Sequence, residues 1–177
     1  MDLSQNYFDI FGLPVSFEVD VQQLAEQYRE LQKAVHPDKF ANASDRDRRL
    51  AVQQAAQINE AFHTLKSPLK RARYLLQLKG VEFDDQRETS FEPEFLMEQM
   101  ELRETLAGIR EKEDALGSLG KLMQDIEQKI QSMQKQLALF IKQDDLELAK
   151  SQIHKLQFLE KLMNECEAME EDLVNLV

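Results

Sequence analysis

The sequence predicts an all-α protein with two parts: an N-terminal helical hairpin with short flanking helices, joined to a C-terminal three-helix bundle. Three observations support this fold class. The 177 residues include only five glycines and four prolines, whereas residues that favour helices, such as Leu, Glu, Gln and Ala, are abundant. Apolar residues recur at steps of three and four, as on one face of an α-helix. The 42% hydrophobic and 31% charged composition excludes a disordered tail.

Charge is distributed unevenly along the chain. Residues 1–76 contain 10 Lys and Arg against 10 Asp and Glu, whereas residues 77–177 contain 12 against 23, so the net charge of −11 belongs to the second half. Binding to nucleic acid requires a basic surface that neutralises phosphates. The acidic half therefore argues against nucleic acid, and we expect protein partners.

The cysteine count and the first residues indicate the cellular compartment of the protein. The single cysteine, Cys166, cannot form an intramolecular disulfide or build a thiolate metal site by itself, which favours a reducing compartment. The opening residues lack the basic and apolar regions of a secretion signal. No run reaches the roughly 18 apolar residues of a membrane span. We expect a cytoplasmic protein with no membrane partner.

The first part, residues 1–80, contains a predicted helical hairpin. A short helix over residues 7–11 comes first. Asp20 resembles an N-cap and begins a long helix that ends near Pro37, and Ser44 begins a second helix of matching length. Two such helices bury facing stripes as an antiparallel pair. The stripes are Leu24, Tyr28, Leu31 and Val35 on the first helix, and Ala51, Ala55, Ile58, Phe62 and Leu65 on the second.

The end of the first part is marked by a third, shorter helix. Ser67 supplies its N-cap and Pro68 its first residue, and Gly80 ends it. Residues 81–92 are strongly acidic and have no sustained periodicity, which indicates a linker between two units.

The second part, residues 93–177, is predicted to contain three helices. The first covers about residues 93–113 and the second residues 122–141, with a break at Gly117 and Gly120 between them.

A capping box formed by Asp144 and Glu147 begins the last helix, which runs nearly to Val177. Short breaks between long amphipathic helices favour an antiparallel bundle. A heptad coiled coil is the alternative. The stripes expected to face each other are Ile126, Ile130, Met133 and Leu137, and Ala149, Ile153, Leu156 and Met163.

The tripeptide His36-Pro37-Asp38 stands where the first long stripe ends. Proline breaks the helix and disfavours α geometry at His36, so an imidazole and a carboxylate are held in a polar loop. Taken alone, the tripeptide is either a solvated helix stop or a functional pair that the loop presents. A further alternative is a metal-dependent or acid/base enzyme that uses His36 and Asp38.

Enzyme signatures are scarce in this sequence. No GxGxxG, P-loop, HExxH, CxxC or GxSxG motif occurs. Two ligands are too few for a metal site. We therefore expect no catalytic residues, no metal and no cofactor. His63 and His154 are expected on helix surfaces or edges, and Cys166 in the core.

Four segments, taken in order, resemble a J domain: YFDIFGL at 7–13, the helix over 28–35, HPDKF at 36–40 and INEAFHTL at 58–65. J-domain proteins stimulate ATP hydrolysis by DnaK-type chaperones, and in that family stimulation fails without His-Pro-Asp. The resemblance therefore implies a chaperone-binding site. Its residues are His36, Pro37, Asp38, Arg29, Lys33 and Lys39.

One feature departs from the usual J-domain pattern. The helix before His-Pro-Asp is usually strongly basic, but here Arg29 and Lys33 are accompanied by Glu26 and Glu30. This departure weakens the electrostatic match to a general chaperone and is compatible with a specialised one.

Two further segments, LKRARYLL at 69–76 and FLMEQMELRE at 95–104, resemble the HscB family, which are co-chaperones of iron–sulfur cluster assembly. The resemblance spans nearly the whole chain. It implies a J domain joined to a three-helix client-binding domain, with the chaperone HscA and the scaffold protein IscU as partners. Eukaryotic relatives can carry a cysteine-rich zinc extension, which this sequence lacks, so the bacterial form is nearer.

The first helix of the second part has two apolar faces. Phe95 and Leu102 belong to one stripe, and Leu96, Met97 and Met100 form a patch about 100° to 200° away around the helix. One packed interface cannot cover both, unless a wide core buries all of them. In the HscB family the matching positions bind the scaffold. The client-binding residues implied are Leu96, Met97, Met100, Glu101, Arg103, Glu104 and Phe158.

Overall fold

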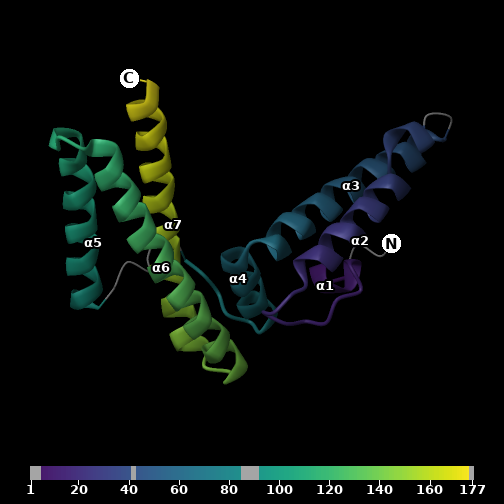
Figure 1. Cartoon of the computed structure of the whole chain (residues 1–177). Helices are drawn as coiled ribbons and strands as arrows, with labels where there is room; N and C mark the ends of the chain where they lie inside the picture. Colours follow the sequence, from purple (N-terminus) through teal and green to yellow (C-terminus); the bar gives the residue numbers. More distant parts are fainter. Residues whose placement is uncertain (1–4, 41–42, 85–91, 176–177) are drawn as a thin grey trace. The chain divides into compact units, whose positions relative to one another are not determined.

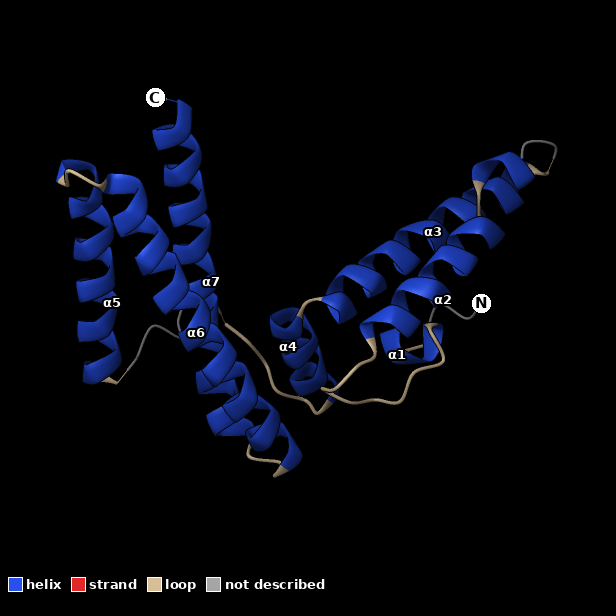
Figure 2. Ribbon diagram, viewed as in Figure 1, coloured by secondary structure: helices blue, strands red, loops and turns tan. Residues whose placement is uncertain are grey.

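The computed structural model describes residues 5–40, 43–84 and 92–175, and all regular elements within these ranges are helices (Figure 1; Figure 2). The prediction of an all-α fold is confirmed. The chain divides into two compact units, Met1–Lys79 and Gly80–Val177. Most of the linker predicted at 81–92 lies outside the described residues.

The first unit is built on an antiparallel hairpin of α2 (Val21–Ala34) and α3 (Asp45–Lys66) (Figure 1). The two helices have 14 and 22 residues, so the prediction of matching lengths was wrong. The reason is that Pro37 follows closely on the end of α2, whereas α3 meets no proline before Pro68.

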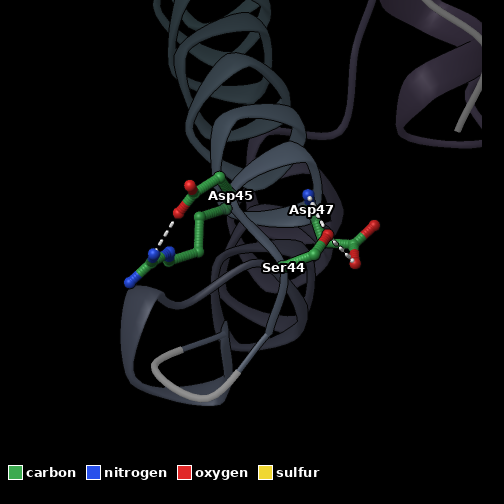
Figure 3. Close-up of polar contacts among 4 residues, drawn as sticks. Ser44, Asp45 and Asp47 are labelled. Atoms are coloured by element: carbon green, nitrogen blue, oxygen red, sulfur yellow. Dashed lines mark hydrogen bonds and ion pairs between the residues drawn. The ribbon is translucent and has the colours of Figure 1, made fainter.

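Both hairpin helices begin at the predicted N-caps. The Asp20 carboxylate accepts hydrogen bonds from the backbone N–H groups of Gln22 and Gln23 at 2.9 and 3.0 Å. The Ser44 hydroxyl accepts one from the backbone N–H of Asp47 at 3.2 Å, as Figure 3 shows. Each side chain satisfies donors that the first turn of a helix leaves without partners.

Two short helices, α1 (Tyr7–Ile10) and α4 (Pro68–Leu78), pack at the base of the hairpin. The Tyr7 and Tyr74 rings stack with their centroids 4.4 Å apart, and the Tyr7 backbone N–H donates to the Tyr74 hydroxyl at 3.0 Å. Gly12, just after α1, has a φ of 61°, which only glycine adopts without cost. The largest fully buried side chains of this unit are Phe8, Leu24, Ile58, Leu65 and Leu76.

The second unit consists of α5 (Pro93–Ala107), a short 3-10 helix η2 (Gly108–Glu111), α6 (Ala115–Lys142) and α7 (Leu146–Asn175). Helices α6 and α7 run antiparallel, and α5 packs beside them in the predicted three-helix arrangement (Figure 2). Its largest fully buried side chains are Ile109, Leu119, Ile126, Leu137, Ile153, Leu156 and Leu159.

The boundaries of α6 and α7 differ from the prediction. Gly117 and Gly120 lie inside α6, because the Asp114 carboxylate caps the helix by accepting from the Gly117 backbone N–H at 2.9 Å. Asp145, not Asp144, caps α7 by accepting from the backbone N–H of Leu148 at 3.2 Å. Asp144 instead adopts a φ of 60° in the tight turn between the helices.

Candidate functional site

The His36-Pro37-Asp38 loop is formed where α2 stops. Val35, which directly follows α2, is buried, and the next residue, His36, is exposed. A short 3-10 helix, η1 (Pro37–Phe40), then turns the chain toward α3. The loop therefore holds its polar side chains at the tip of the hairpin, away from the core.

The imidazole of His36 and the carboxylate of Asp38 lie side by side. The backbone N–H of Asp38 donates to Nδ1 of His36 at 3.3 Å, and Oδ2 of Asp38 is 3.6 Å from the same nitrogen. The two side chains are 57% and 90% exposed. The imidazole therefore uses Nδ1 for a contact within the loop, and its other nitrogen, Nε2, takes no part in that contact. The Asp38 carboxylate is free to accept charge-assisted hydrogen bonds from a cation on a partner surface.

The basic residues near the loop carry local partners. Lys33 Nζ is 2.8 Å from Oε1 of Glu30, and Arg29 Nε donates to the carbonyl of Ala25 at 3.1 Å. The hydrogen bond and charge of Lys33 lower the pKa of Glu30, which keeps that carboxylate ionised. The outer face of α2 is thus a mixed surface on which Glu30 offsets part of the positive charge. Lys39, in η1, is exposed.

No observation on the described residues favours the enzyme alternative. His36 and Asp38 stand in water, whereas acid–base catalysis gains most in sites that exclude water. Within the described ranges, no three side chains of His, Cys, Asp or Glu come together as a metal site would require.

The second candidate surface is the outer face of α5, formed by Leu96, Met97 and Met100. These side chains are 42%, 63% and 63% exposed, while Phe95 on the inner side of the helix is buried. The alternative of a wide core that covers all of them was therefore wrong. Glu101 and Glu104 are also exposed, so the apolar face lies among carboxylates.

Polar contacts along both edges of α5 fix which face points outward. On one edge, Glu98 forms an ion pair with Lys129 of α6. On the other edge, Arg103 lies 3.2 Å from a carboxylate oxygen of Glu165 in α7. After α5, Arg110 of η2 pairs with Asp172 of α7 at 2.7 Å. The outer face lies between these edges, and no described helix of the bundle covers Leu96, Met97 or Met100.

Phe158, one of the client-binding residues that the resemblance implies, is half-buried at the α5–α7 seam. Its ring packs edge to face on Phe95, with the centroids 5.8 Å apart. The Arg103 guanidinium covers the same ring at 5.5 Å from the centroid. The structure thus brings Phe158 together with Arg103 and places it at the border of the outer face.

Sequence reasoning missed Glu165 as part of this seam. A helix returns to the same side after seven residues, so the spacing from Phe158 to Glu165 placed both on one side of α7. This spacing could have placed Glu165 beside Phe158, but it does not identify Arg103 as the partner of Glu165.

The remaining histidines and the cysteine lie outside both candidate surfaces. His63 is exposed, and His154 is half-buried with its ring centroid 5.8 Å from that of Phe83. Cys166 is fully buried, as predicted. Burial, together with the charges of Glu165 and Glu167, raises the pKa of its thiol.

Comparison with known proteins identifies both units. Residues 6–74 match the model of the DnaJ domain, and residues 91–167 match that of the HSCB C-terminal oligomerisation domain. A curated relative from Vibrio cholerae, named Co-chaperone protein HscB homolog, is 48% identical over 173 residues, which cover 96% of this chain and 99% of the relative. The chain belongs to the HscB family of co-chaperones.

Solved structures of HscB proteins share the fold. Chaperone HscB from Vibrio cholerae aligns with a TM-score of 0.88 and 47% identity, covering 96% of this chain and 99% of that one. The human co-chaperone protein HscB aligns with a TM-score of 0.89 and 28% identity, covering 96% and 84%. In the part of the chain that the structure describes, no helix is both long enough and apolar enough to span a membrane.

Proposed function

We propose that this HscB-family chain stimulates ATP hydrolysis by the DnaK-type chaperone HscA and delivers the iron–sulfur scaffold protein IscU to it. The J domain, assigned to residues 1–80, would act on the chaperone, and the helices of residues 93–177 would bind the scaffold. Residues 81–92 would link the two. The proposal includes the cytoplasm as the compartment, which a single buried cysteine suits.

The chaperone-binding part rests on the exposed pair formed by His36 and Asp38. The exposed imidazole of His36 and the exposed carboxylate of Asp38 would make polar contacts with a partly cationic surface of the chaperone. Because Val35 anchors the chain directly before this loop, the pair is held in place without contributing to the core. Arg29, Lys33 and Lys39 would add electrostatic attraction at longer range.

The observation that carries the client-binding part is the exposure of Leu96, Met97 and Met100 on one face of α5. A contiguous apolar face rimmed by charged residues is typical of a protein-binding surface. Methionine side chains adapt to a partner at low cost because they are flexible and polarisable. Glu101, Arg103 and Glu104 would set the orientation of IscU by electrostatic complementarity, and Phe158 would extend the apolar contact at the seam.

Steady-state ATP hydrolysis by HscA tests the proposal. The rate is measured with HscA alone, with IscU, with this protein, and with both together. We expect each protein to stimulate HscA by itself and the pair to exceed the sum of the two. The purified chain alone should hydrolyse no ATP. Absence of any stimulation by this protein would reject the proposed function.

A further inference from the structure

Two ion pairs join the segment of α5 and η2 to α7, and they repeat at a spacing of seven residues. Arg103 pairs with Glu165 at 3.2 Å, and Arg110 pairs with Asp172 at 2.7 Å. Seven residues make about two turns of a helix, so both acidic residues lie on the same side of α7. The two pairs therefore have the same chemistry and the same partner helix.

The two pairs differ in their surroundings. The first borders the outer face of α5, where the Arg103 guanidinium lies over the Phe158 ring at 5.5 Å from its centroid. Arg103 and Phe158 both belong to the proposed client-binding surface. The second pair lies beyond the end of α5, because Arg110 is part of η2. A role in client recognition is therefore expected of the Glu165 pair and not of the Asp172 pair.

Glu165 supplies the carboxylate that holds Arg103, because α5 offers none in a suitable place. A helical side chain meets neighbours three and four positions away. For Arg103 these neighbours are uncharged; they are Gln99, Met100, Leu106 and Ala107. The carboxylates of Glu101 and Glu104 belong to residues that lie about 100° or more from Arg103 around α5. The position of the guanidinium is thus set from α7.

The contacts of Glu165 leave part of the guanidinium available to a partner. Nη1 of Arg103 donates to Oε2 of Glu165 at 3.2 Å, and the Arg103 side chain is 48% exposed. A guanidinium carries several N–H donors, of which this hydrogen bond occupies one. An arginine side chain that is already ordered loses less conformational entropy when a partner binds it. The Glu165 pair therefore favours binding through Arg103.

The charge of Glu165 contributes little to the fold itself. Its side chain is 36% exposed, and ion pairs between exposed residues add little to stability. Lys161, one turn before Glu165 on α7, is exposed, and the carboxylate nevertheless pairs with Arg103 of α5. The pair is thus better explained by the surface that it shapes than by the stability of the bundle.

We propose that Glu165 is a positioning residue for client recognition, which holds Arg103 over Phe158 in the orientation that IscU binds. This inference rests on the proposed function. It extends the client-binding surface to a residue of α7 that acts through Arg103 and makes no contact with the client itself.

Titration calorimetry of the full-length chain with IscU tests the role of Glu165. Glu165→Gln keeps the size of the side chain and removes its charge. We expect the dissociation constant for IscU to rise about three- to tenfold, as for the ordering of one long side chain at an interface. Thermal unfolding of the same sample should change little, because the pair is exposed.

Asp172→Asn is the matched control. It removes one carboxylate from the second ion pair on the same side of α7, so the net charge changes by the same amount. This variant should bind IscU as the wild-type chain does. An equal loss of affinity in both variants would assign the effect to the seam or to net charge and would overturn the inference.

A double-mutant cycle separates positioning from a direct contact of Glu165 with IscU. Arg103→Ala should weaken binding, and adding Glu165→Gln to that variant should cause no further loss, because the group that Glu165 positions is gone. Losses that add in full would show that Glu165 does not act through Arg103. A structural role alone would not produce this dependence on Arg103.

Two other outcomes would also overturn the inference. Unchanged affinity of Glu165→Gln would show that Arg103 needs no positioning, and tighter binding would show that Glu165 competes with IscU for the guanidinium. Both leave the proposed function intact, because the wild-type chain still binds IscU in them. Failure of the wild-type chain to bind IscU would reject the proposed function itself.

Discussion

The guanidinium of Arg103 lies over the ring of Phe158, 5.5 Å from its centroid, and joins α5 to α7. The opposite side of the seam holds Phe95, whose ring meets Phe158 edge to face. Rotation of α5 that buried Leu96 would break both contacts. The seam therefore keeps the outer face of α5 exposed, and the first prediction depends on it.

Replacing Leu96, Met97 and Met100 together by alanine should abolish binding of IscU. Truncating an interface hot spot commonly costs about 2 kcal/mol or more, and alanine favours helix, so the loss should come with little change in helicity. Titration calorimetry with IscU, paired with circular dichroism, measures both quantities. Stimulation of HscA in the absence of IscU should be unchanged.

The matched control for this triple variant is the pair Leu139→Ala and Leu148→Ala. Both residues are exposed apolar side chains of the same unit, on α6 and α7 instead of α5. IscU should bind this control normally. If the folded triple variant binds as tightly as the control, the client site is not on α5.

Asp38→Asn should remove stimulation of HscA and leave the fold intact. The Asp38 side chain is 90% exposed, and substitutions at such positions change stability by no more than about 0.5 kcal/mol. The asparagine side chain of the variant keeps the shape of Asp38 but lacks the charge that a cation on the chaperone would recognise. ATP hydrolysis and thermal unfolding are measured on the same sample. Full stimulation by the variant would contradict the assignment of the loop.

Arg29→Ala and Lys33→Ala should weaken stimulation more at low salt than at high salt. Both residues are exposed, and salt screens attraction between exposed charges. Glu30→Gln supplies the opposite test, because it removes the carboxylate that pairs with Lys33. It should lower the concentration for half-maximal stimulation at low salt. The same salt response in all three variants would show that α2 does not attract the chaperone electrostatically.

Two glycines of α6 should respond in different ways to alanine. Gly120→Ala adds a side chain into open space and should raise the free energy of unfolding by about 1 kcal/mol. At Gly117 a Cβ atom would meet the Asp114 carboxylate, which caps α6. Displacing the Asp114 side chain costs about 1 kcal/mol, so Gly117→Ala should not raise the free energy of unfolding. Denaturant unfolding compares the two, and equal gains would show that Asp114 contributes no cap.

The first unit should lose stability at high pH through Tyr7. Burial and a hydrogen bond to Glu60 raise the pKa of Tyr7 from 10 to about 12. The folded state therefore holds the phenolic proton more tightly than the unfolded state. This contribution is complete below about pH 10 and is lost as the pH rises to about 12. Tyr7→Phe should flatten the fall in unfolding free energy between about pH 10 and about pH 12. Parallel curves would assign the fall to other groups.

The elements whose boundaries depend on local chemistry could be predicted from the sequence. The caps at Asp20, Ser44 and Ser67 act on neighbours within three residues, and each starts a helix as predicted. Gly117 was misread because glycine usually interrupts helices, whereas here the Asp114 cap lies before it and accepts its N–H.

The candidate site could be predicted in part for the same reason. A helical wheel separates Leu96 from Phe95 without any knowledge of the neighbouring helices. The contacts of Arg103 with Glu165 and Phe158 join residues more than fifty positions apart, and no periodicity links them.

In the proposed function, one chain holds both partners at once. A mixture of the Asp38→Asn chain and the Leu96/Met97/Met100 triple-alanine chain tests it most directly, with IscU-dependent ATP hydrolysis by HscA as the readout. Each variant retains the surface that the other lacks. We expect the mixture to show no cooperative stimulation with IscU, whereas the wild-type chain at the same concentration does. Restoration of that stimulation by the mixture would contradict delivery of IscU by a single bridging chain.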